Sequence, residues 1–127
     1  MRLLLDTHIF LWVVAGSRLL KPSARKTIQN AEEVFISSAS IWEVAIKVRL
    51  GKLEANPESL VAAISLSGFT ELPVHGSHAA RVASLPMHHT DPFDRLLIAQ
   101  AFLEPLHLLT ADAALAKYGE LVVLCGD

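Results

Sequence analysis

The chain has 127 residues, the length of one ordinary domain, and we expect residues 1–127 to form a single domain. Hydrophobic residues make up 52% of the chain and charged residues 19%, which supplies a sizeable core and argues against a disordered protein. The net charge of −2 gives no overall basic character, and the lone cysteine, Cys125, excludes a disulfide framework or cysteine-based zinc site within one chain.

The predicted elements alternate between short apolar strands and longer helices. In chain order they are a strand at residues 1–5, helices at 8–15 and 22–31, a strand at 34–37, helices at 38–50 and 57–66, a strand at 69–74, helices at 76–85 and 92–103, a strand at 106–110, a short helix at 112–118 and a last strand at 121–125. The helix at 38–50 has a clear signal, because apolar residues recur at helical spacing: Ile41, Val44, Ala45 and Val48.

The predicted strands are continuous apolar runs. They lack the alternation of apolar and polar residues that is typical of a strand with one solvent-exposed face. Together with the intervening helices, they predict a three-layer α/β/α sandwich with a mainly parallel central sheet. In such sheets ligands bind outside the carboxyl ends of the strands. The first polar residues after each strand are therefore the candidates for a functional site.

The N-terminus resembles the start of a signal peptide, because Arg2 is followed by apolar residues. Asp6 interrupts that stretch, and residues 7–17 are too short to span a bilayer, which takes about 20 residues. We therefore expect a cytoplasmic protein with no membrane association.

Acidic residues gather at one predicted edge of the sheet. Asp6 follows the first strand, Glu43 lies early in the helix after the second, and Asp112 follows the fourth. Asp91 and Asp94 open the helix that leads into that fourth strand. Clustered carboxylates repel one another, and hard cations such as Mg²⁺ or Mn²⁺ relieve that cost. Such a site suits phosphodiester hydrolysis.

Three of these acids also have structural explanations. Asp6 and Asp112 could cap the helices that follow them. Ser40 and Glu43 spell the S-x-x-E pattern of a capping box, although a helix that starts near Ser38 would place Glu43 beyond the required position.

For Asp91, capping is the interpretation that we favour. Asp91 fits the N-cap, with Pro92 in the first helical position and Asp94 one turn in. His88 and His89 precede it, but adjacent histidines do not share a helix face, and we do not assign them to a metal.

Other patterns are weaker. Three serines near residue 38 and six histidines raise the idea of a Ser-His-Asp hydrolase, but the chain has no G-x-S-x-G elbow and no glycine-rich phosphate loop. His8 could lie near Asp6 and orient substrate or water, although we favour a surface or packing role. Trp12 and Trp42 lie on apolar helical faces, and we expect them in the core or at an interface.

Four segments carry a resemblance to a known family. LLLDTHIFLW, SSASIWEVAIKVRLGKL, DPFDRLLIAQA and LLTAD together resemble the PIN domain, and more narrowly the VapC toxins of bacterial and archaeal toxin–antitoxin pairs. The resemblance covers essentially the whole chain. It implies an α/β/α sandwich and a Mg²⁺- or Mn²⁺-dependent endoribonuclease, the toxin of a type II pair, that hydrolyses RNA with a metal-activated water. The implied partners are a VapB-type antitoxin, whose C-terminal segment occupies a groove of the toxin, and a second copy of the chain.

The resemblance also assigns residues. The catalytic and metal-binding acids fall on Asp6, Glu43, Asp94 and Asp112, while Asp91 is an extra acid and only a possible ligand. Two small hydroxyl residues near the metal fall on Thr7 and Thr110.

Basic residues are candidates for binding the flanking phosphates. Seven of the eleven Lys and Arg residues lie between Arg18 and Lys52, which hints at a polyanion partner, with a solvated helix face as the alternative. The predicted phosphate-binding residues are Arg18, Lys47, Arg49 and Lys52.

Three other functions stay open. Asp6 could be the nucleophile of a phosphatase or phosphotransferase, although the D-x-D start of such enzymes is absent, since His8 stands at its second acidic position. The chain could be a catalytically silent module that binds RNA or protein. The substrate could also be DNA.

Overall fold

The computed structural model describes residues 1–125. Its elements are β1 (Arg2–Leu5), α1 (Thr7–Ala15), α2 (Pro22–Gln29), β2 (Glu33–Ser37), α3 (Ser38–Arg49), α4 (Pro57–Leu66), β3 (Thr70–Leu72), α5 (Gly76–Arg81), the 3₁₀ helix η1 (Val82–Ser84), α6 (Pro92–Leu103), β4 (His107–Thr110), the 3₁₀ helix η2 (Ala113–Tyr118) and β5 (Val122–Leu124). Five strands form one sheet in the order β3-β2-β1-β4-β5, and every neighbouring pair is parallel.

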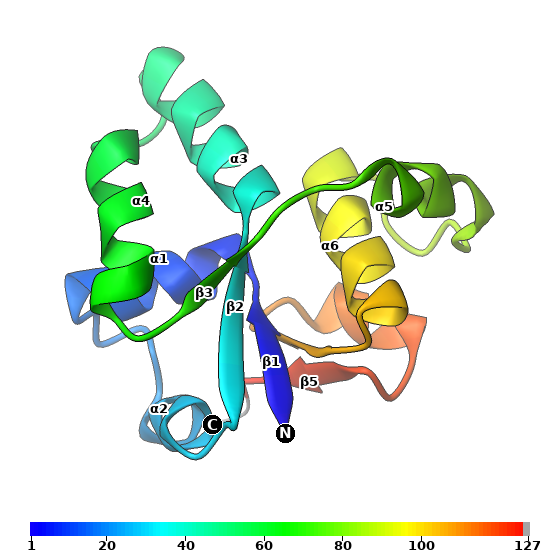
Figure 1. Cartoon of the computed structure of the whole chain (residues 1–127), viewed down its shortest axis with the longest axis horizontal. Coiled ribbons are helices and arrows are strands. Elements are labelled where there is room, and N and C mark those ends of the chain that lie inside the picture. The colour runs from blue at the N-terminus through cyan, green and yellow to red at the C-terminus, as the bar shows by residue number, and fades with distance from the viewer. Residues whose placement is uncertain (126–127) are drawn as a thin grey trace.

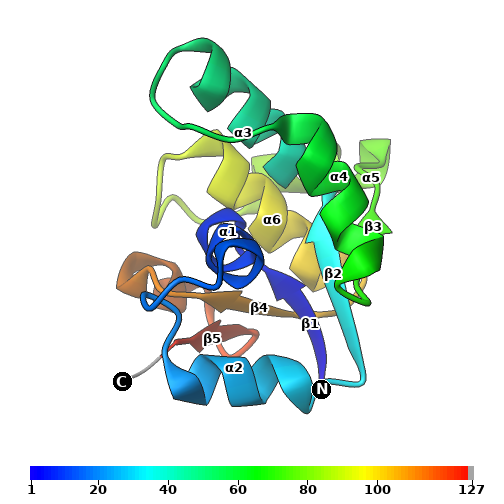
Figure 2. The same ribbon diagram turned by 90° about the vertical axis from the view of Figure 1, so that its left-hand side faces the viewer.

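Helices cover both faces of this sheet (Figure 1). The first layer, which holds α1, α2 and α4, faces the viewer in Figure 2, and α5 and α6 lie on the opposite side of the sheet. The predicted three-layer sandwich with a parallel central sheet is confirmed. None of the helices within the described residues has the length and apolar character needed to cross a bilayer.

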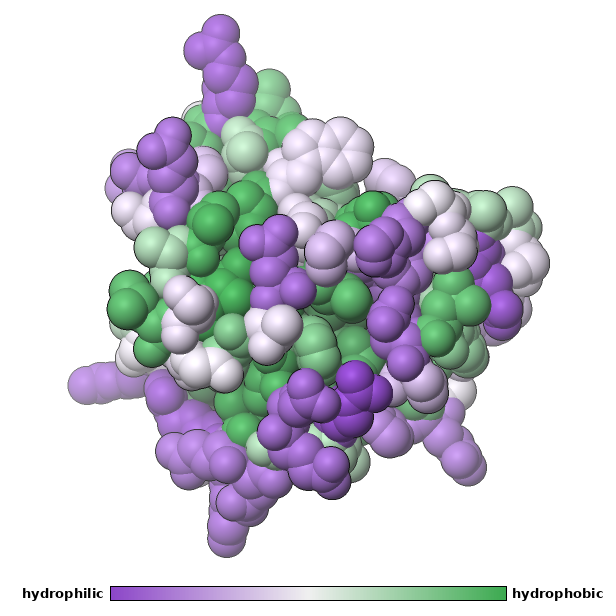
Figure 3. Space-filling model, viewed as in Figure 1, coloured by the Kyte–Doolittle hydropathy of each residue, from purple (hydrophilic) through white to green (hydrophobic). Residues whose placement is uncertain are grey.

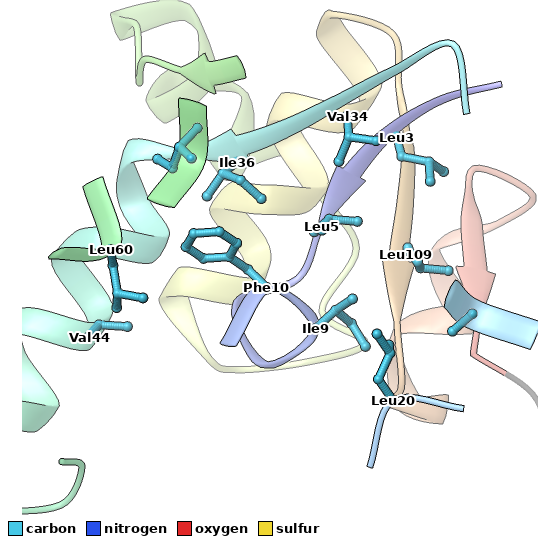
Figure 4. Close-up of a cluster of buried hydrophobic side chains, with 12 residues drawn as sticks. Leu3, Leu5, Ile9, Phe10, Leu20, Val34, Ile36, Val44, Leu60 and Leu109 are labelled. Carbon is cyan, nitrogen blue, oxygen red and sulfur yellow. The ribbon is translucent and has the colours of Figure 1, made fainter. Parts of the chain in front are cut away.

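Successive side chains of β1 point to opposite faces of the sheet, and a hydrophobic core lies on each face. Leu3 and Leu5 point into the first core, which α1, α2, α3 and α4 complete (Figure 4). Leu4 points to the other face, where it packs with residues of α6 and β4 such as Leu97 and Leu108. All three leucines of β1 are fully buried. Each contributes about 1.5–3 kcal/mol, so the central strand is fixed from both faces.

Most predicted elements agree with the structure to within two residues at each end, and three show differences in extent or type. The strand expected at residues 69–74 is limited to Thr70–Leu72, since Pro73 has no N–H to donate. The helix expected at 76–85 divides into α5 and η1. The helix expected at 112–118 is a 3₁₀ helix.

The buried face of β1 gives a test of this packing. We expect Leu4→Ala to lower the free energy of unfolding by about 3 kcal/mol, because the central strand cannot collapse into the cavity left behind. Leu19, which is 63% exposed between α1 and α2, provides the matched control, and Leu19→Ala should change stability by less than about 0.5 kcal/mol. Urea unfolding measures both; equal losses would contradict the assignment of Leu4 to the core.

Candidate active site

Asp6 is the single residue between β1 and α1, at the carboxyl edge of the sheet. The neighbouring strand β4 holds its side chain: the Thr110 hydroxyl donates to Asp6 Oδ2 at 2.6 Å. Asp6 makes no side-chain hydrogen bond that caps α1, so capping does not explain this residue. The side chain is buried, and burial raises the pKa of the carboxyl, which the Thr110 hydrogen bond opposes only in part.

Glu43 lies in the second turn of α3 and is buried. The helix is capped by Ser37, whose hydroxyl accepts from the Ala39 N–H at 3.0 Å, so the capping-box explanation of Glu43 is wrong. The Thr7 hydroxyl donates to Glu43 Oε1 at 2.8 Å. Ser40 Oγ lies 2.8 Å from the same hydroxyl. The start of α1 and the second turn of α3 are thereby joined at the carboxylate.

Lys47 is the cation nearest to the buried acids. Its Nζ lies 2.7 Å from Glu43 Oε2, one helical turn away. The hydrogen bond to Glu43 raises the pKa of Lys47, and the charges of Asp91 and Asp94 add to this. Lys47 lines a hollow of about 210 Å³ together with Thr7 and Lys52. Two of the predicted phosphate-binding residues therefore border the site, whereas Arg18 and Arg49 are exposed and lie outside this hollow.

Asp91 begins α6 in the way that the sequence predicts. Its Oδ1 accepts from the Asp94 N–H at 3.0 Å, and Pro92 follows at the first helical position. Asp112 also caps, since its Oδ1 accepts from the Ala114 N–H at 2.9 Å. In each of these two carboxylates one oxygen caps a helix, and the other oxygen is available to bind a cation.

His89 is the site residue that sequence reasoning missed. Its Nε2 lies 2.9 Å from Asp94 Oδ2 and 3.9 Å from Asp112 Oδ2. Within residues 1–125, these three side chains form the only group of three His, Cys, Asp or Glu residues whose ligand atoms all lie within 4.8 Å of one another. The argument from a shared helix face did not apply, because His89 lies in the loop that enters α6.

Arg95 is the second residue that was missed. It is 8% exposed, and its guanidinium clamps the segment before α6. The guanidinium donates to the backbone oxygens of Val82 at 3.0 Å, Leu85 at 3.4 Å, Pro86 at 2.9 Å and His89 at 3.4 Å, and to the Tyr118 hydroxyl at 3.1 Å. The signal available in the sequence was the single basic residue of a mostly apolar helix.

The predicted acids thus form two adjoining groups, one buried and one more open. Asp6 and Glu43 are held by threonines, while Asp94 and Asp112 face His89. The groups adjoin because α3 starts at the carboxyl end of β2, beside β1, and packs beside α6 (Figure 1).

The two groups act on each other electrostatically. Burial, followed by the charges of Asp6 and Asp91, raises the pKa of Asp94 to about 7, against the opposing hydrogen bond with His89. Among the described residues, neither Asp6 nor Asp94, the two carboxyls whose pKa is raised, forms an ion pair with a Lys or Arg. Carboxylate oxygens with one imidazole are ligands that suit a divalent ion such as Mg²⁺ or Mn²⁺.

Comparison with known proteins agrees with this geometry. Residues 3–121 match the family model of the PIN domain. The chain belongs to the PIN-domain family. This PIN domain is 28% identical to "Ribonuclease VapC22" of Mycobacterium tuberculosis, over 91% of this chain and 90% of that protein.

Solved structures share the PIN fold over nearly the whole chain. A toxin–antitoxin complex from Klebsiella pneumoniae aligns with a TM-score of 0.69 and 20% identity, over 98% of each chain. VapBC2 from Rickettsia felis, bound to a promoter DNA fragment, aligns with a TM-score of 0.67 and 19% identity, over 98% of this chain and 97% of that chain. At these identities the likeness shows the fold.

The capping role of Asp91 can be tested by mutation. We expect Asp91→Ala to lower the free energy of unfolding by about 1 kcal/mol, because the Asp94 N–H loses its acceptor. Asp91→Asn keeps a side-chain oxygen at the same position and should retain most of the stability. Equilibrium unfolding in EDTA measures both; equal losses from the two substitutions would point to the charge of Asp91 and not to its capping bond.

The stability of the metal-free PIN domain should depend on pH through Asp94. Its pKa is about 7 in the folded protein and about 4 in the unfolded chain, so ionisation opposes folding. Its contribution to stability is complete below about pH 4 and is lost as the pH rises through about 7. We expect the unfolding temperature in EDTA to fall from about pH 5 to about pH 8.

Asp94→Asn is the matched control, because it keeps the shape and removes the ionisation. The variant should lose less stability than the wild type over the same pH range, and saturating Mg²⁺ should flatten the wild-type curve. Parallel curves for wild type and variant in EDTA would show that Asp94 is not the titrating group.

Proposed function

We propose that this chain, as one PIN-like domain over residues 1–127, is a divalent-metal-dependent endoribonuclease that acts in the cytoplasm as the toxin of a toxin–antitoxin pair. The observation that carries the proposal is the meeting of Asp6, Glu43 and Asp94 at one sheet edge, with the pKa of Asp94 raised to about 7. The similarity to a protein named as a VapC ribonuclease supports RNA as the substrate.

The residues that would hold the cation are the four predicted acids, Asp6, Glu43, Asp94 and Asp112. His89 joins them as a candidate ligand, because its Nε2 faces both Asp94 and Asp112. A bound Mg²⁺ or Mn²⁺ would activate water and offset the charge of the phosphodiester. Asp91 stays outside the four acids, as a possible ligand only: its Oδ1 caps α6, and His89 contacts Asp94 and Asp112 instead.

The other polar residues act on the carboxylates or on the substrate. Thr110 and Thr7 fix the orientation of Asp6 and Glu43, which makes them positioning residues. Lys47 and Lys52 line the adjoining hollow and would receive a flanking phosphate as point charges. Arg18 and Arg49, which are exposed, would contact the strand farther out.

A VapB-type antitoxin is the proposed partner. An apolar groove of about 490 Å³ lies between α1 and the loop before α4, lined by residues that include Leu11, Trp12, Leu53 and Leu60. An apolar segment would fill this groove, and a basic side chain would satisfy the nearby acids. The structural neighbours from Klebsiella pneumoniae and Rickettsia felis are toxin–antitoxin assemblies, which supports this proposal.

We also propose a homodimer. Val61 and Leu66 of α4 are 46% and 85% exposed. Hydrophobic residues gather on the face that α4 and β3 occupy (Figure 3). Covering such side chains is a common reason for self-association.

Asp6→Asn tests the enzymatic proposal. The substitution removes a charge from the cation site and keeps the shape of the side chain, so we expect RNA cleavage to fall at least about 100-fold while the fold survives. Sequencing of RNA ends after induced expression, beside the wild type, measures cleavage and its positions. EDTA should abolish wild-type cleavage, and Mg²⁺ or Mn²⁺ should restore it.

Undiminished cleavage by a folded Asp6→Asn variant, or full wild-type activity in excess EDTA, would overturn the proposal. A phosphoryl-aspartate on Asp6 would favour the phosphotransferase alternative. Metal binding without cleavage of RNA or DNA would favour a silent binding module, and cleavage of DNA alone would reassign the substrate.

A further inference from the structure

Trp42 is unusually exposed for a tryptophan. It lies on α3, and 60% of its surface is accessible, although its apolar neighbours in the sequence predicted a place in the core or at an interface. One contact defines its position: the ring of Phe93, on α6, meets it edge to face with centroids 5.1 Å apart and an interplanar angle of 71°. The pair bridges the two helices that carry Glu43 and Asp94.

The two aromatic residues are sequence neighbours of two of the acids. Trp42 directly precedes Glu43, and Phe93 directly precedes Asp94. Successive residues on an α-helix point about 100° apart, so each ring stands beside a carboxylate and not among the carboxylates. A group stacked on Trp42 would therefore lie next to the point where the scissile phosphate must bind.

The contact with Phe93 restrains the indole without covering it. A T-shaped pair uses the edge of one ring and leaves a face of the tryptophan open. Nucleobases stack on such faces whatever their identity, because every base has a π surface. A base inside a duplex has no free face, so the platform selects unpaired nucleotides.

The charges on α3 favour a nucleic acid over an apolar protein segment. Arg49 lies seven residues after Trp42, about two helical turns, and thus on the same side of the helix. It is exposed. Lys47 lies between them in the chain, beside the acids. An exposed aromatic face with an arginine on the same side of the helix is a combination that binds single strands.

We propose that Trp42, braced by Phe93, is the stacking platform for an unpaired base adjacent to the cleaved phosphodiester. This inference rests on the proposed ribonuclease function and adds the residue that holds an unpaired base beside the cleaved bond. Trp42 is a binding residue that determines which RNA positions can enter the site.

Binding of RNA to a cleavage-deficient parent tests the proposal. The parent carries Asp6→Asn, and the probe is a fluorescein-labelled single-stranded RNA of about ten nucleotides, titrated in Mg²⁺. Adding Trp42→Ala should weaken binding by about 5- to 150-fold, the equivalent of one stacked base. Trp42→Phe should retain most of the affinity, and Leu103→Ala, which truncates an exposed apolar side chain at the last residue of α6, should leave it unchanged.

Abasic RNA separates stacking from a general structural effect. A series of RNA probes is used in which each probe lacks one base. The probe that lacks the stacked base should bind the parent weakly, and adding Trp42→Ala should not weaken its binding further. In the Trp12→Phe background, RNA should quench the fluorescence of the remaining indole. Equal weakening of every abasic probe by Trp42→Ala would overturn the proposal.

Light scattering measures the oligomeric state and tests the alternative that Trp42 lies at an interface between two copies of the chain. If Trp42→Ala converts a dimer to a monomer and RNA affinity is unchanged, the aromatic pair is an interface between copies and the proposal is wrong. If the parent binds RNA and Trp42→Ala binds equally well, the stacking proposal fails and the ribonuclease proposal stands. If the parent and the wild type neither bind nor cut RNA, both proposals fail together.

Discussion

The parallel pairing of β1 with β2 on one side and β4 on the other is the constraint on which the site depends. Because the three strands run the same way, their carboxyl ends meet at one edge, and the residues that follow them are brought together. Asp6 and Thr110 meet across this edge although 104 positions separate them in the chain. The burial of β1 on both faces holds the edge in place, so the core positions the chemistry.

The same edge carries an electrostatic cost. Burial and mutual repulsion raise the pKa of Asp6 and Asp94, and the protein offsets the cost with threonine hydroxyls, Lys47 and His89. These partners neutralise the acids only in part. Because negative charge remains at this edge, a metal cation or a basic side chain of a partner can bind there.

Local pattern was sufficient to predict the order of the elements and the edge where the acids meet. Strand 1–5 and helix 92–103 were evident because each contains a short apolar run, residues 3–5 and 96–99, with polar residues on both sides. The capping of α6 by Asp91 follows from neighbouring residues alone. What depended on contacts between distant segments escaped prediction: the approach of His89 to Asp112, the bonds of Arg95, and the exposure of Trp42.

Arg95 has a consequence for how the molecule opens. Five acceptors between Val82 and Tyr118 converge on one guanidinium, and the Tyr118 hydroxyl also donates to the Pro86 oxygen at 3.0 Å, so the anchors of the segment before α6 are connected to one another. Residues 82–89 should therefore detach as one cooperative unit, with a common free energy of local unfolding in hydrogen exchange. His89 belongs to that unit and Asp94 does not. The bonds of Arg95 thus help to keep His89 beside Asp94 and Asp112.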